Sequence, residues 1–451
     1  MRLKKVVAGL LAGAMLCSVA GCSSNPQKVE LKNPDGTLKV YYQNNTNTRS
    51  AIDEFAKEHP NLNLELEGFS NLEEMDNRIS TEMNSGQGPD VMVMNLTTSL
   101  DLNKMMSGKN LLDLKPWLEK DDSFQTENYY PVLNAGELEG KQVIMPLSFN
   151  MMFGITTQEL LDEAGIGLNT QTGELKDYLN ALESAVNWKE ENYLTFSAPA
   201  KNAATLCTLL SDFTGRSLVD VTTKEVHIPE ELKQIADIVR QSNAILEAEQ
   251  AVISKTYAND FVGRARHTIM TLYNVYPLVD TKLFDEAYRQ DEPMEPRFFA
   301  LPTHEGSDTY HAMVMDLACV NANTKNANAA YQLVRYLMDY DAPLPQNSQQ
   351  ASSVGIPVNR SVLEGQIQDT MTIGGQNIRS AGELIPVSPL SEEHAQKVRD
   401  CLDRISSVSL FNPKVTQIFS DCMGPYLDGT TSDYEGCVKE LENKLKLYVN
   451  E

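Results

Sequence analysis

Residues 38–94 carry the strongest structural signal in the chain and read LKVYYQNNTNTRSAIDEFAKEHPNLNLELEGFSNLEEMDNRISTEMNSGQGPDVMVM. Leu38–Tyr42 has the composition of a strand, and apolar residues at helical spacing over Arg49–His59 predict a helix that Pro60 ends. Leu62–Leu66 alternates leucine with polar residues, which predicts a second strand.

The same stretch continues with a second helix and a third strand. Met75, Ile79 and Met83 lie at helical spacing, Gly86–Asp90 breaks the chain, and Val91–Met94 is an apolar strand. Strands that alternate with helices in this order are typical of a mainly parallel sheet covered by helices. We therefore expect an α/β fold.

The rest of the chain is richer in helix patterns. A capping box formed by Thr156 and Glu159 precedes the first of them. Helices are expected over Gln158–Ala164, Gly173–Trp188, Glu230–Leu246 and Asn328–Met338, and two more near the end, one lined by Ala395, Val398, Leu402 and Ile405 and the other by Val438, Leu441, Leu445 and Tyr448.

The N-terminus has the pattern of a secretory signal that ends in a cysteine. Basic residues precede the apolar run Val6–Val19, and small residues precede Cys22, so residues 1–21 are predicted to be a signal peptide and Cys22 the diacylated residue of a bacterial lipobox. A transmembrane anchor would need about 20 consecutive apolar residues, and this run is shorter. Residues 22–36 are polar and are expected to form a flexible tether, so that folding begins near Leu38.

The length of the chain indicates the number of domains, and its charge and motifs exclude several classes of function. The 451 residues are too many for one ordinary core, so two domains are expected. The net charge of -24 argues against binding to nucleic acid or to anionic lipid by the folded part. No metalloprotease, nucleophile-elbow or phosphate-loop motif occurs, so neither catalysis nor a cofactor is expected.

The cysteines predict no complete disulfide framework. Five remain besides Cys22 and the one in the signal, and five is an odd number. Cys207 and Cys319 lie in apolar stretches, where a thiol usually packs as a small hydrophobe. Cys422 could pair with Cys437 or with Cys401 in an oxidising exterior. No cysteine or histidine spacing indicates a metal site.

Several local patterns follow one another in an order that resembles a known family. They are residues 52–67, Ser85–Val91, Leu111–Trp117, Gly136–Pro146, Gly154–Thr156, Leu160–Ile166, Leu301–Thr303 with Gly306, Asn326–Leu337 and Val354–Val358. Behind a lipobox, this order is similar to that of the extracellular solute-binding proteins of ABC importers, family 1, whose best-known members bind sugars. The chain departs from the family where Thr156 and Thr157 replace the usual Tyr-Asn.

The resemblance implies a two-lobe fold of the periplasmic-binding-protein type II, in which each lobe is a mainly parallel sheet flanked by helices and hinge strands join the lobes. Lobe 1 is expected at 37–149 and 310–360, and lobe 2 at 150–309 and 361–451. The solute would bind in the cleft between them, and closure of the lobes would signal to the transporter.

A sugar needs planar amides or carboxylates for its hydroxyls and an aromatic face for its C–H side. Asn44 and Asn45 follow the first strand and Asn95 follows the third, where ligand-facing loops begin; capping of the next helix is an equally open interpretation. Asp90 is more typical of a turn.

The resemblance adds further candidates for ligand contact. Phe149 and Asn150 lie at the expected hinge, and Tyr273 is the candidate for ring stacking, with a core aromatic as the alternative. The other candidates are Asn274 and Tyr276 beside Tyr273, and His311 and Gly355 near the second crossing. By their charge alone, Arg264 and Arg266 could clamp an anionic solute, although solvated basic residues are the commoner outcome.

Together these patterns predict a lipid-anchored receptor on the extracellular face of a bacterial cell membrane, of the kind typical of Gram-positive relatives. It would capture a small solute, expected to be a sugar or an oligosaccharide, and deliver it as a monomer to the transmembrane subunits of an ABC permease. Two alternatives stay open: a receptor for a membrane sensor kinase, and a surface glycan-active enzyme with two carboxylates facing a cleft.

Overall fold

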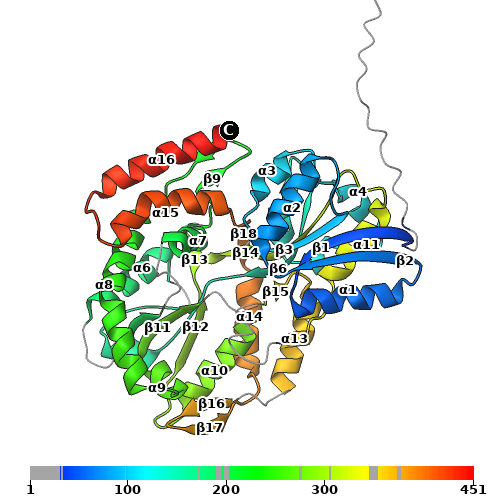
Figure 1. The fold of residues 1–451 in the computed structure, drawn as a ribbon. Helices are drawn as coiled ribbons and strands as arrows, with labels where there is room; N and C mark the ends of the chain where they lie inside the picture. The colour runs from blue at the N-terminus through cyan, green and yellow to red at the C-terminus, as the bar shows by residue number, and fades with distance from the viewer. Residues whose placement is uncertain are drawn as a thin grey trace, which may run out of the picture.

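The computed structural model shows two lobes, each built around a β-sheet with helices packed against it (Figure 1). It describes residues 31, 34–96, 98–170, 173–188, 194–197, 203–273, 277–303, 306–344, 354–372 and 377–451. The two-lobe α/β architecture expected from the sequence is confirmed. The expected lobe boundaries, at 149/150, 309/310 and 360/361, stay predictions.

The first lobe contains an eight-stranded sheet in which the order is β15-β6-β14-β3-β1-β2, with β13 and β18 also paired to β14. Its strands are β1 (Gly36–Gln43), β2 (Leu62–Phe69), β3 (Val91–Asn95), β6 (Ile144–Asn150), β13 (Pro302–Thr303), β14 (Gly306–Val320), β15 (Ile356–Pro357) and β18 (Ile405–Ser409). β1 runs parallel to β2 and β3, as the pattern of residues 38–94 predicts.

Helices and short turns surround this sheet. α2 packs on β1 and β2, α11 packs on β6 and β14, and α1 lies beside α11. The elements are α1 (Thr46–Glu58), α2 (Leu72–Asn84), α3 (Leu102–Ser107), α4 (Lys115–Leu118), η1 (Thr126–Asn128), η2 (Pro131–Gly136), the hairpin of β4 (Glu137–Leu138) and β5 (Lys141–Gln142), α11 (Ala327–Met338) and α13 (Arg360–Thr372).

The second lobe contains a four-stranded sheet in the order β12-β7-β11-β8. Its strands are β7 (Phe153–Thr157), β8 (Leu194–Ser197), β11 (Thr268–Tyr273) and β12 (Pro296–Ala300). The remaining elements are α5 (Gln158–Glu163), α6 (Leu175–Asn187), α7 (Ala203–Thr214), β9 (Val219–Asp220), β10 (Glu225–Val226), α8 (Leu232–Thr256), α9 (Phe261–Arg266), α10 (Pro277–Arg289), β16 (Asn377–Ser380), β17 (Glu383–Pro386), α14 (Glu392–Leu402), α15 (Pro413–Leu427) and α16 (Tyr434–Asn450).

Both sheets are mixed, where the sequence predicted mainly parallel ones. The long strand β14 runs antiparallel to β3 on one side and to β6 on the other. In the second sheet, β7 runs antiparallel to β11 and β12, and only β8 is parallel to β11.

Two chain crossings lie side by side between the sheets. β6 ends at Asn150 in the first sheet and β7 begins at Phe153 in the second, so Met151 and Met152 form one crossing. β12 and β13 are joined by Leu301, whose backbone N–H donates to the carbonyl of Met152 at 3.2 Å. This hydrogen bond ties the two crossings into one hinge.

Two local predictions were wrong by a few residues. Thr157, not Thr156, caps α5: its hydroxyl accepts from the N–H of Leu160, while Thr156 is a buried residue of β7. Ile405 does not continue the helix of Leu402, because that helix ends and Ile405 begins β18.

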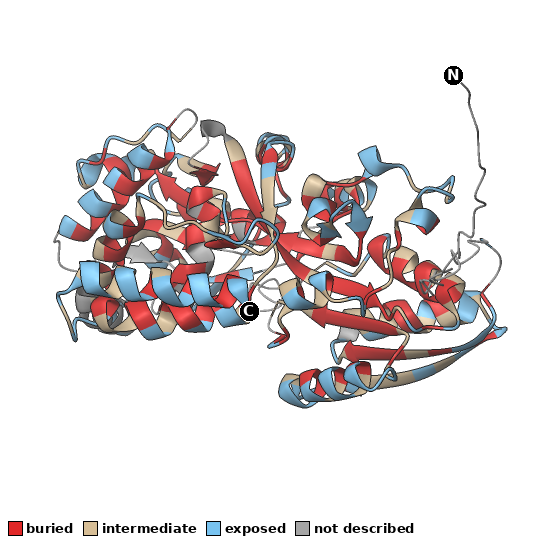
Figure 2. Ribbon diagram, turned by 90° about the horizontal axis from the view of Figure 1, so that it is seen from above, coloured by how far each residue is buried: buried red, intermediate tan, exposed pale blue. Residues whose placement is uncertain are grey.

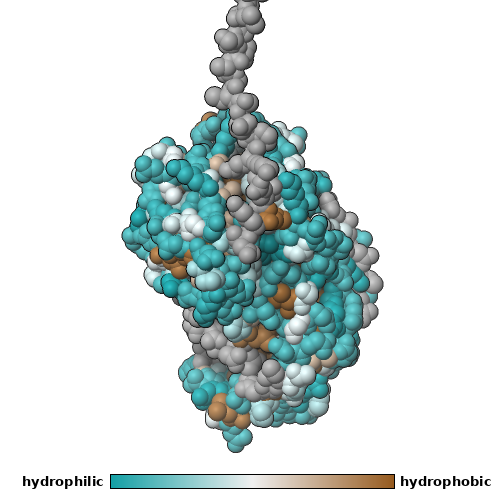
Figure 3. Space-filling model, turned by 90° about the vertical axis from the view of Figure 1, so that its right-hand side faces the viewer, coloured by the Kyte–Doolittle hydropathy of each residue, from teal (hydrophilic) through white to brown (hydrophobic). Residues whose placement is uncertain are grey.

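Buried residues follow the strands and the inner faces of the helices in both lobes (Figure 2). Val91–Met94 is buried at every position, because that strand is covered on both faces. The side of the molecule seen in Figure 3 is mostly hydrophilic, in keeping with the net charge of -24. Within the described residues, none of the helices combines the length and the apolar composition needed to cross a membrane.

The five cysteines of the folded part are free thiols, so Cys422 forms a disulfide with neither Cys437 nor Cys401. Burial raises the pKa of the Cys207, Cys319 and Cys401 thiols to about 12. These thiols therefore stay protonated at neutral pH and pack as small hydrophobes.

Candidate functional site

The carboxyl ends of three strands in the first sheet meet at the edge that faces the second lobe. β1, β3 and β6 run in the same direction, because β14 is antiparallel to both β3 and β6. Each of the three ends in an amide: Gln43 in β1, Asn95 in β3 and Asn150 in β6. In open α/β sheets, ligands bind outside such carboxyl ends.

Two of these amides have a buried oxygen with no hydrogen-bond partner among the described residues, Oε1 of Gln43 and Oδ1 of Asn150. Leaving a buried acceptor unpaired costs about 1–3 kcal/mol. A solute that donates hydrogen bonds to this edge would remove that cost. Asn150 was a candidate from the sequence, and its side chain is only 6% exposed. Gln43 was missed, although it ends the first strand as Asn95 ends the third.

The two asparagines after β1, Asn44 and Asn45, have different structural roles. The side-chain amide of Asn44 donates to the hydroxyl of Ser70 at 3.3 Å, and its backbone N–H donates to the carbonyl of Phe69 at 2.8 Å. Asn44 therefore ties the ends of β1 and β2 together. Oδ1 of Asn45 accepts from the N–H of Thr48 at 2.8 Å, so Asn45 caps α1.

A small cavity of about 100 Å³ lies beside these residues, between the N-terminal end of α1, the strands β6 and β14, and Gly355. Asn45 and Gly355, which the sequence proposed separately, both line it. A Cβ atom at Gly355 would lie 2.3 Å from Oγ of Ser148 and 3.1 Å from N of Phe149. Only glycine therefore lets this segment approach β6 so closely.

Ser148 and Asp316 are two of the polar residues that line this cavity, called the hinge cavity below. The Ser148 hydroxyl donates to Oδ2 of Asp316 at 2.5 Å, and the Asp316 N–H donates to Oγ of Ser148 at 3.2 Å. Asp316 pairs with Asn95 of β3 and with Ser148 of β6, and the register between β14 and β6 shifts on both sides of Asp316. Burial raises the pKa of the Asp316 carboxyl to about 6. The sequence signal for Asp316 was a single charge within an apolar strand.

Two further candidates are fully enclosed. Phe149 has no exposed surface, and its ring packs edge-on against Tyr130 with the centroids 5.5 Å apart. His311 is 3% exposed, and its ring nitrogens lie 2.9 Å from the hydroxyls of Ser407 and Ser409 in β18. Burial lowers the pKa of His311 to about 3, so its imidazole is neutral. The imidazole links β14 to β18.

On the side of the second lobe, Tyr273 is the last residue of β11 and its backbone pairs with Phe153 beside the hinge. The position of its side chain, and all of Asn274 and Tyr276, lie outside the described part of the chain, as does Cys22. The guanidinium of Arg266 donates to the carbonyls of Tyr288, Gln290 and Glu292, so Arg266 holds a loop and not an anion. Arg264 is exposed.

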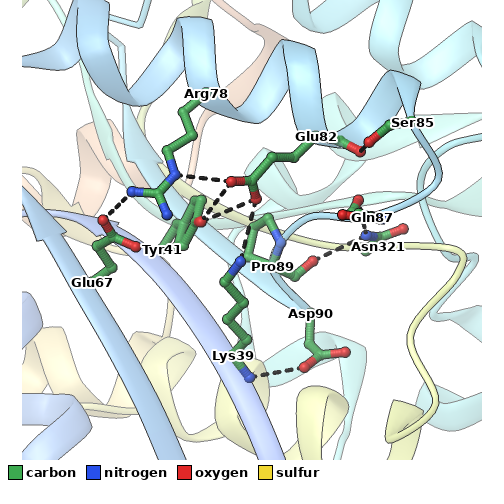
Figure 4. Close-up of polar contacts among 10 residues, drawn as sticks. All are labelled: Lys39, Tyr41, Glu67, Arg78, Glu82, Ser85, Gln87, Pro89, Asp90 and Asn321. Atoms are coloured by element: carbon green, nitrogen blue, oxygen red, sulfur yellow. Dashed lines mark hydrogen bonds and ion pairs between the residues drawn. The ribbon is translucent and has the colours of Figure 1, made fainter.

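Asp90 lies at the opposite end of the sheet and is structural. One carboxylate oxygen accepts from the N–H of Lys39 at 2.8 Å and the other accepts from the hydroxyl of Thr324 at 2.6 Å. Figure 4 shows Asp90 beside the amide of Asn321, which donates to the carbonyl of Pro89 at 3.0 Å. The interpretation of Asp90 as a turn residue fits these contacts.

A second, larger cavity of about 470 Å³ lies between α3, η2 and the β9–β10 hairpin, and none of the sequence candidates lines it. Its polar residues include Asn103, Asn134, Arg216, Asp220 and His227. Among the described residues, no group of three or more His, Cys, Asp or Glu side chains is placed to hold a metal ion.

Comparison with known proteins identifies the family. The family described as bacterial extracellular solute-binding protein matches residues 50–372. The chain therefore belongs to the bacterial extracellular solute-binding proteins.

Solved structures share the fold at low sequence identity. An extracellular solute-binding protein family 1 from Alicyclobacillus acidocaldarius superposes with a TM-score of 0.56 at 16% identity, covering 93% of this chain and 100% of that one. A periplasmic oligogalacturonide-binding protein from Yersinia enterocolitica gives 0.58 at 14%, covering 92% and 99%. An ABC substrate-binding protein from Listeria monocytogenes in complex with cycloalternan gives 0.53 at 15%, covering 92% and 98%.

Proposed function

We propose that the protein is a lipid-anchored receptor of an ABC importer, which captures a carbohydrate between its lobes and delivers it to the transmembrane permease subunits. The observation that carries this proposal is the row of amides at the carboxyl ends of β1, β3 and β6, with unpartnered buried oxygens on Gln43 and Asn150. Membership of the solute-binding family supports the import role.

The chemistry of the edge favours a ligand with many hydroxyl groups. The unpartnered amide oxygens are acceptors, and so is the Asp316 carboxylate, whose residue pairs with Asn95 in the sheet, so the missing partners are donors. A sugar presents several hydroxyls on one rigid ring. Two proteins of similar fold are described with carbohydrate ligands, an oligogalacturonide and cycloalternan, which supports this class of solute. Tyr273 is the proposed stacking partner, since it ends β11 beside the hinge.

The anchor would keep the receptor beside its permease. Diacylation of Cys22 holds the folded part near the membrane through residues 22–36, so that its local concentration at the permease depends on the tether and not on a tight contact. The receptor could then release a delivered solute and dissociate quickly.

A thermal-shift screen tests the class of solute. Sugars and oligosaccharides, amino acids, short peptides, polyamines and inorganic anions are compared with the purified protein. A bound ligand at about 100 times its dissociation constant adds about 2.7 kcal/mol to the free energy of unfolding. We expect stabilisation by a carbohydrate, and its loss in Asn150→Ala but not in the exposed control Asn450→Ala. Stabilisation by another class alone would overturn the carbohydrate assignment.

A further inference from the structure

A groove of about 410 Å³ lies between α1 and α11 of the first lobe. Phe55 of α1 and His59 directly after it line one side, and Tyr331, Arg335 and Tyr336 of α11 line the other. Leu31, which precedes the first strand, also lines the groove. We propose that residues 22–33 of the tether dock in this groove through their apolar side chains and so fix which side of the receptor faces the membrane.

The groove offers rings to an apolar side chain. The Phe55 ring lies 4.4 Å from the His59 ring and 5.4 Å from the Tyr336 ring, centroid to centroid. The charged groups of the groove already have partners: Arg335 pairs with Asp121 and Asp339. The aromatic rings can bury an aliphatic side chain favourably, while Ser123 and Gln332 add polar surface to the groove.

Leu31 is a large hydrophobic side chain that is partly exposed to solvent. Only three large hydrophobic side chains are exposed among the described residues, and Leu31, at 40%, is the least exposed of them. The other two, Leu384 and Leu447, expose 59% and 64%. Val29 precedes Leu31 by two positions, so in an extended chain both would point to the same side. The tether therefore carries two apolar side chains that can enter one groove.

The chain is also held where it leaves the groove. The side-chain amide of Asn326, at the start of α11, donates to the carbonyl of Asp35 at 2.6 Å. Gly36 then takes a left-handed conformation with φ of 81°, which turns the chain into β1. Leu31 and Asp35 thus lie along the same helix, Leu31 against its middle and Asp35 at its start.

The charge of the rim suits the tether. Burial raises the pKa of Tyr336, and the nearby carboxylates of Glu58 and Glu54 raise it further. These two carboxylates on α1 are exposed and lie near Tyr336, which lines the groove. Lys28 and Lys32 flank the apolar pair of the tether and bring positive charge to this acidic rim.

Docking would shorten the free length of chain between Cys22 and the folded part. Between Cys22 and Leu31 the chain can span at most about 30 Å, whereas from Cys22 to Gly36 it could span about 50 Å. If Cys22 carries the lipid, as proposed above, a docked tether keeps the edge formed by α1 and α11 close to the bilayer. The docking itself does not depend on lipid or solute.

Trypsin tests the docking, because it cuts after Lys28 and Lys32. Cleavage of the mature protein is followed by intact mass and compared with that of Leu31→Ser, while free peptides of the same two sequences give the intrinsic rates. When opening is fast, the cleavage rate follows the population of the undocked tether. We expect the tether to be cut at least tenfold more slowly in the native protein than in Leu31→Ser, and Leu384→Ser to behave as the native protein.

Equal rates in the native protein and in Leu31→Ser, after correction by the peptides, would overturn the proposal. Protection that grows with protein concentration would also overturn it, because the groove would then hold a second copy. Leu31 lies outside every helix and strand, so its substitution leaves the folded part intact and the comparison stays informative.

Discussion

Replacing Asp316 by asparagine should stabilise the protein at neutral pH and leave it unchanged in acid. Burial raises the pKa of the Asp316 carboxyl from 3.8 to about 6. The folded state therefore holds this proton more tightly than the unfolded state, so the free energy of unfolding falls as the pH rises from about 4 through about 6. Since one pKa unit corresponds to 1.36 kcal/mol, the loss amounts to at most about 3 kcal/mol.

Asparagine removes the charge and keeps the hydrogen bond. Its amide oxygen can accept from the Ser148 hydroxyl as the carboxylate does, and it does not ionise. Asp316→Asn should thus exceed the native protein in stability by up to about 3 kcal/mol near neutral pH, with no difference near pH 4. Urea unfolding at both pH values measures this difference. The exposed Asp122→Asn serves as the control.

The same substitution should weaken solute binding, because a carboxylate accepts hydrogen bonds from hydroxyls more strongly than an amide does. A variant that is more stable but binds its solute more weakly is typical when a buried charge serves function at the expense of stability. A stability difference that is the same at both pH values, or a variant that is less stable at neutral pH, would refute the reasoning about Asp316.

Three further substitutions probe the surroundings of the site. Asn45→Ala should lower the free energy of unfolding by about 1 kcal/mol, because it removes the cap of α1; an unchanged urea midpoint would contradict this. Gly355→Ala should lower solute affinity and stability together, since its Cβ would lie 2.3 Å from the Ser148 hydroxyl; calorimetric binding equal to native would show that the hinge cavity is not used. Tyr448→Phe should cost about 1–3 kcal/mol in thermal unfolding, because the Tyr448 hydroxyl donates to Asp101 at 2.8 Å and joins α16 to α3; no loss would make that contact dispensable.

The local pattern of residues 38–94 predicted β1, α1, β2, α2 and β3 because each of these elements has its own period and its own breaker. The strand β14 could not be placed in this way. It lies more than 200 residues after β3 and enters the sheet between β3 and β6, and both of those pairings are antiparallel. Contacts of that range leave no trace in the spacing of apolar residues.

The two misplaced residues have related causes. Ile405 follows Leu402 at helical spacing, yet its backbone pairs with Tyr310 of β14. The pairing of Ile405 with β14 therefore outweighed the helical spacing of the local sequence. Thr156 and Thr157 are adjacent and both can cap a helix, and burial of Thr156 in β7 decided between them. Neither choice can be made without the fold.

The candidate site was predicted in part, and for a physical reason. Asn95 was proposed because it follows a strand pattern, and Asn150 because the resemblance places it at the hinge; both end strands of the first sheet. Gln43 and Asp316 were missed, because their significance depends on which polar atoms lack a partner or are buried. Burial and hydrogen bonding are properties of the packed structure and not of spacing.

The central claim is that a carbohydrate binds at the amides that end β1, β3 and β6. A calorimetric titration with the sugar identified in the thermal-shift screen tests this claim most directly. Native protein and Asn150→Ala are titrated side by side, with Asn450→Ala as the control. We predict at least tenfold weaker binding for Asn150→Ala, which corresponds to about 1.4 kcal/mol. Equal affinities for the native protein and Asn150→Ala would contradict the placement of the solute at the carboxyl ends of β1, β3 and β6.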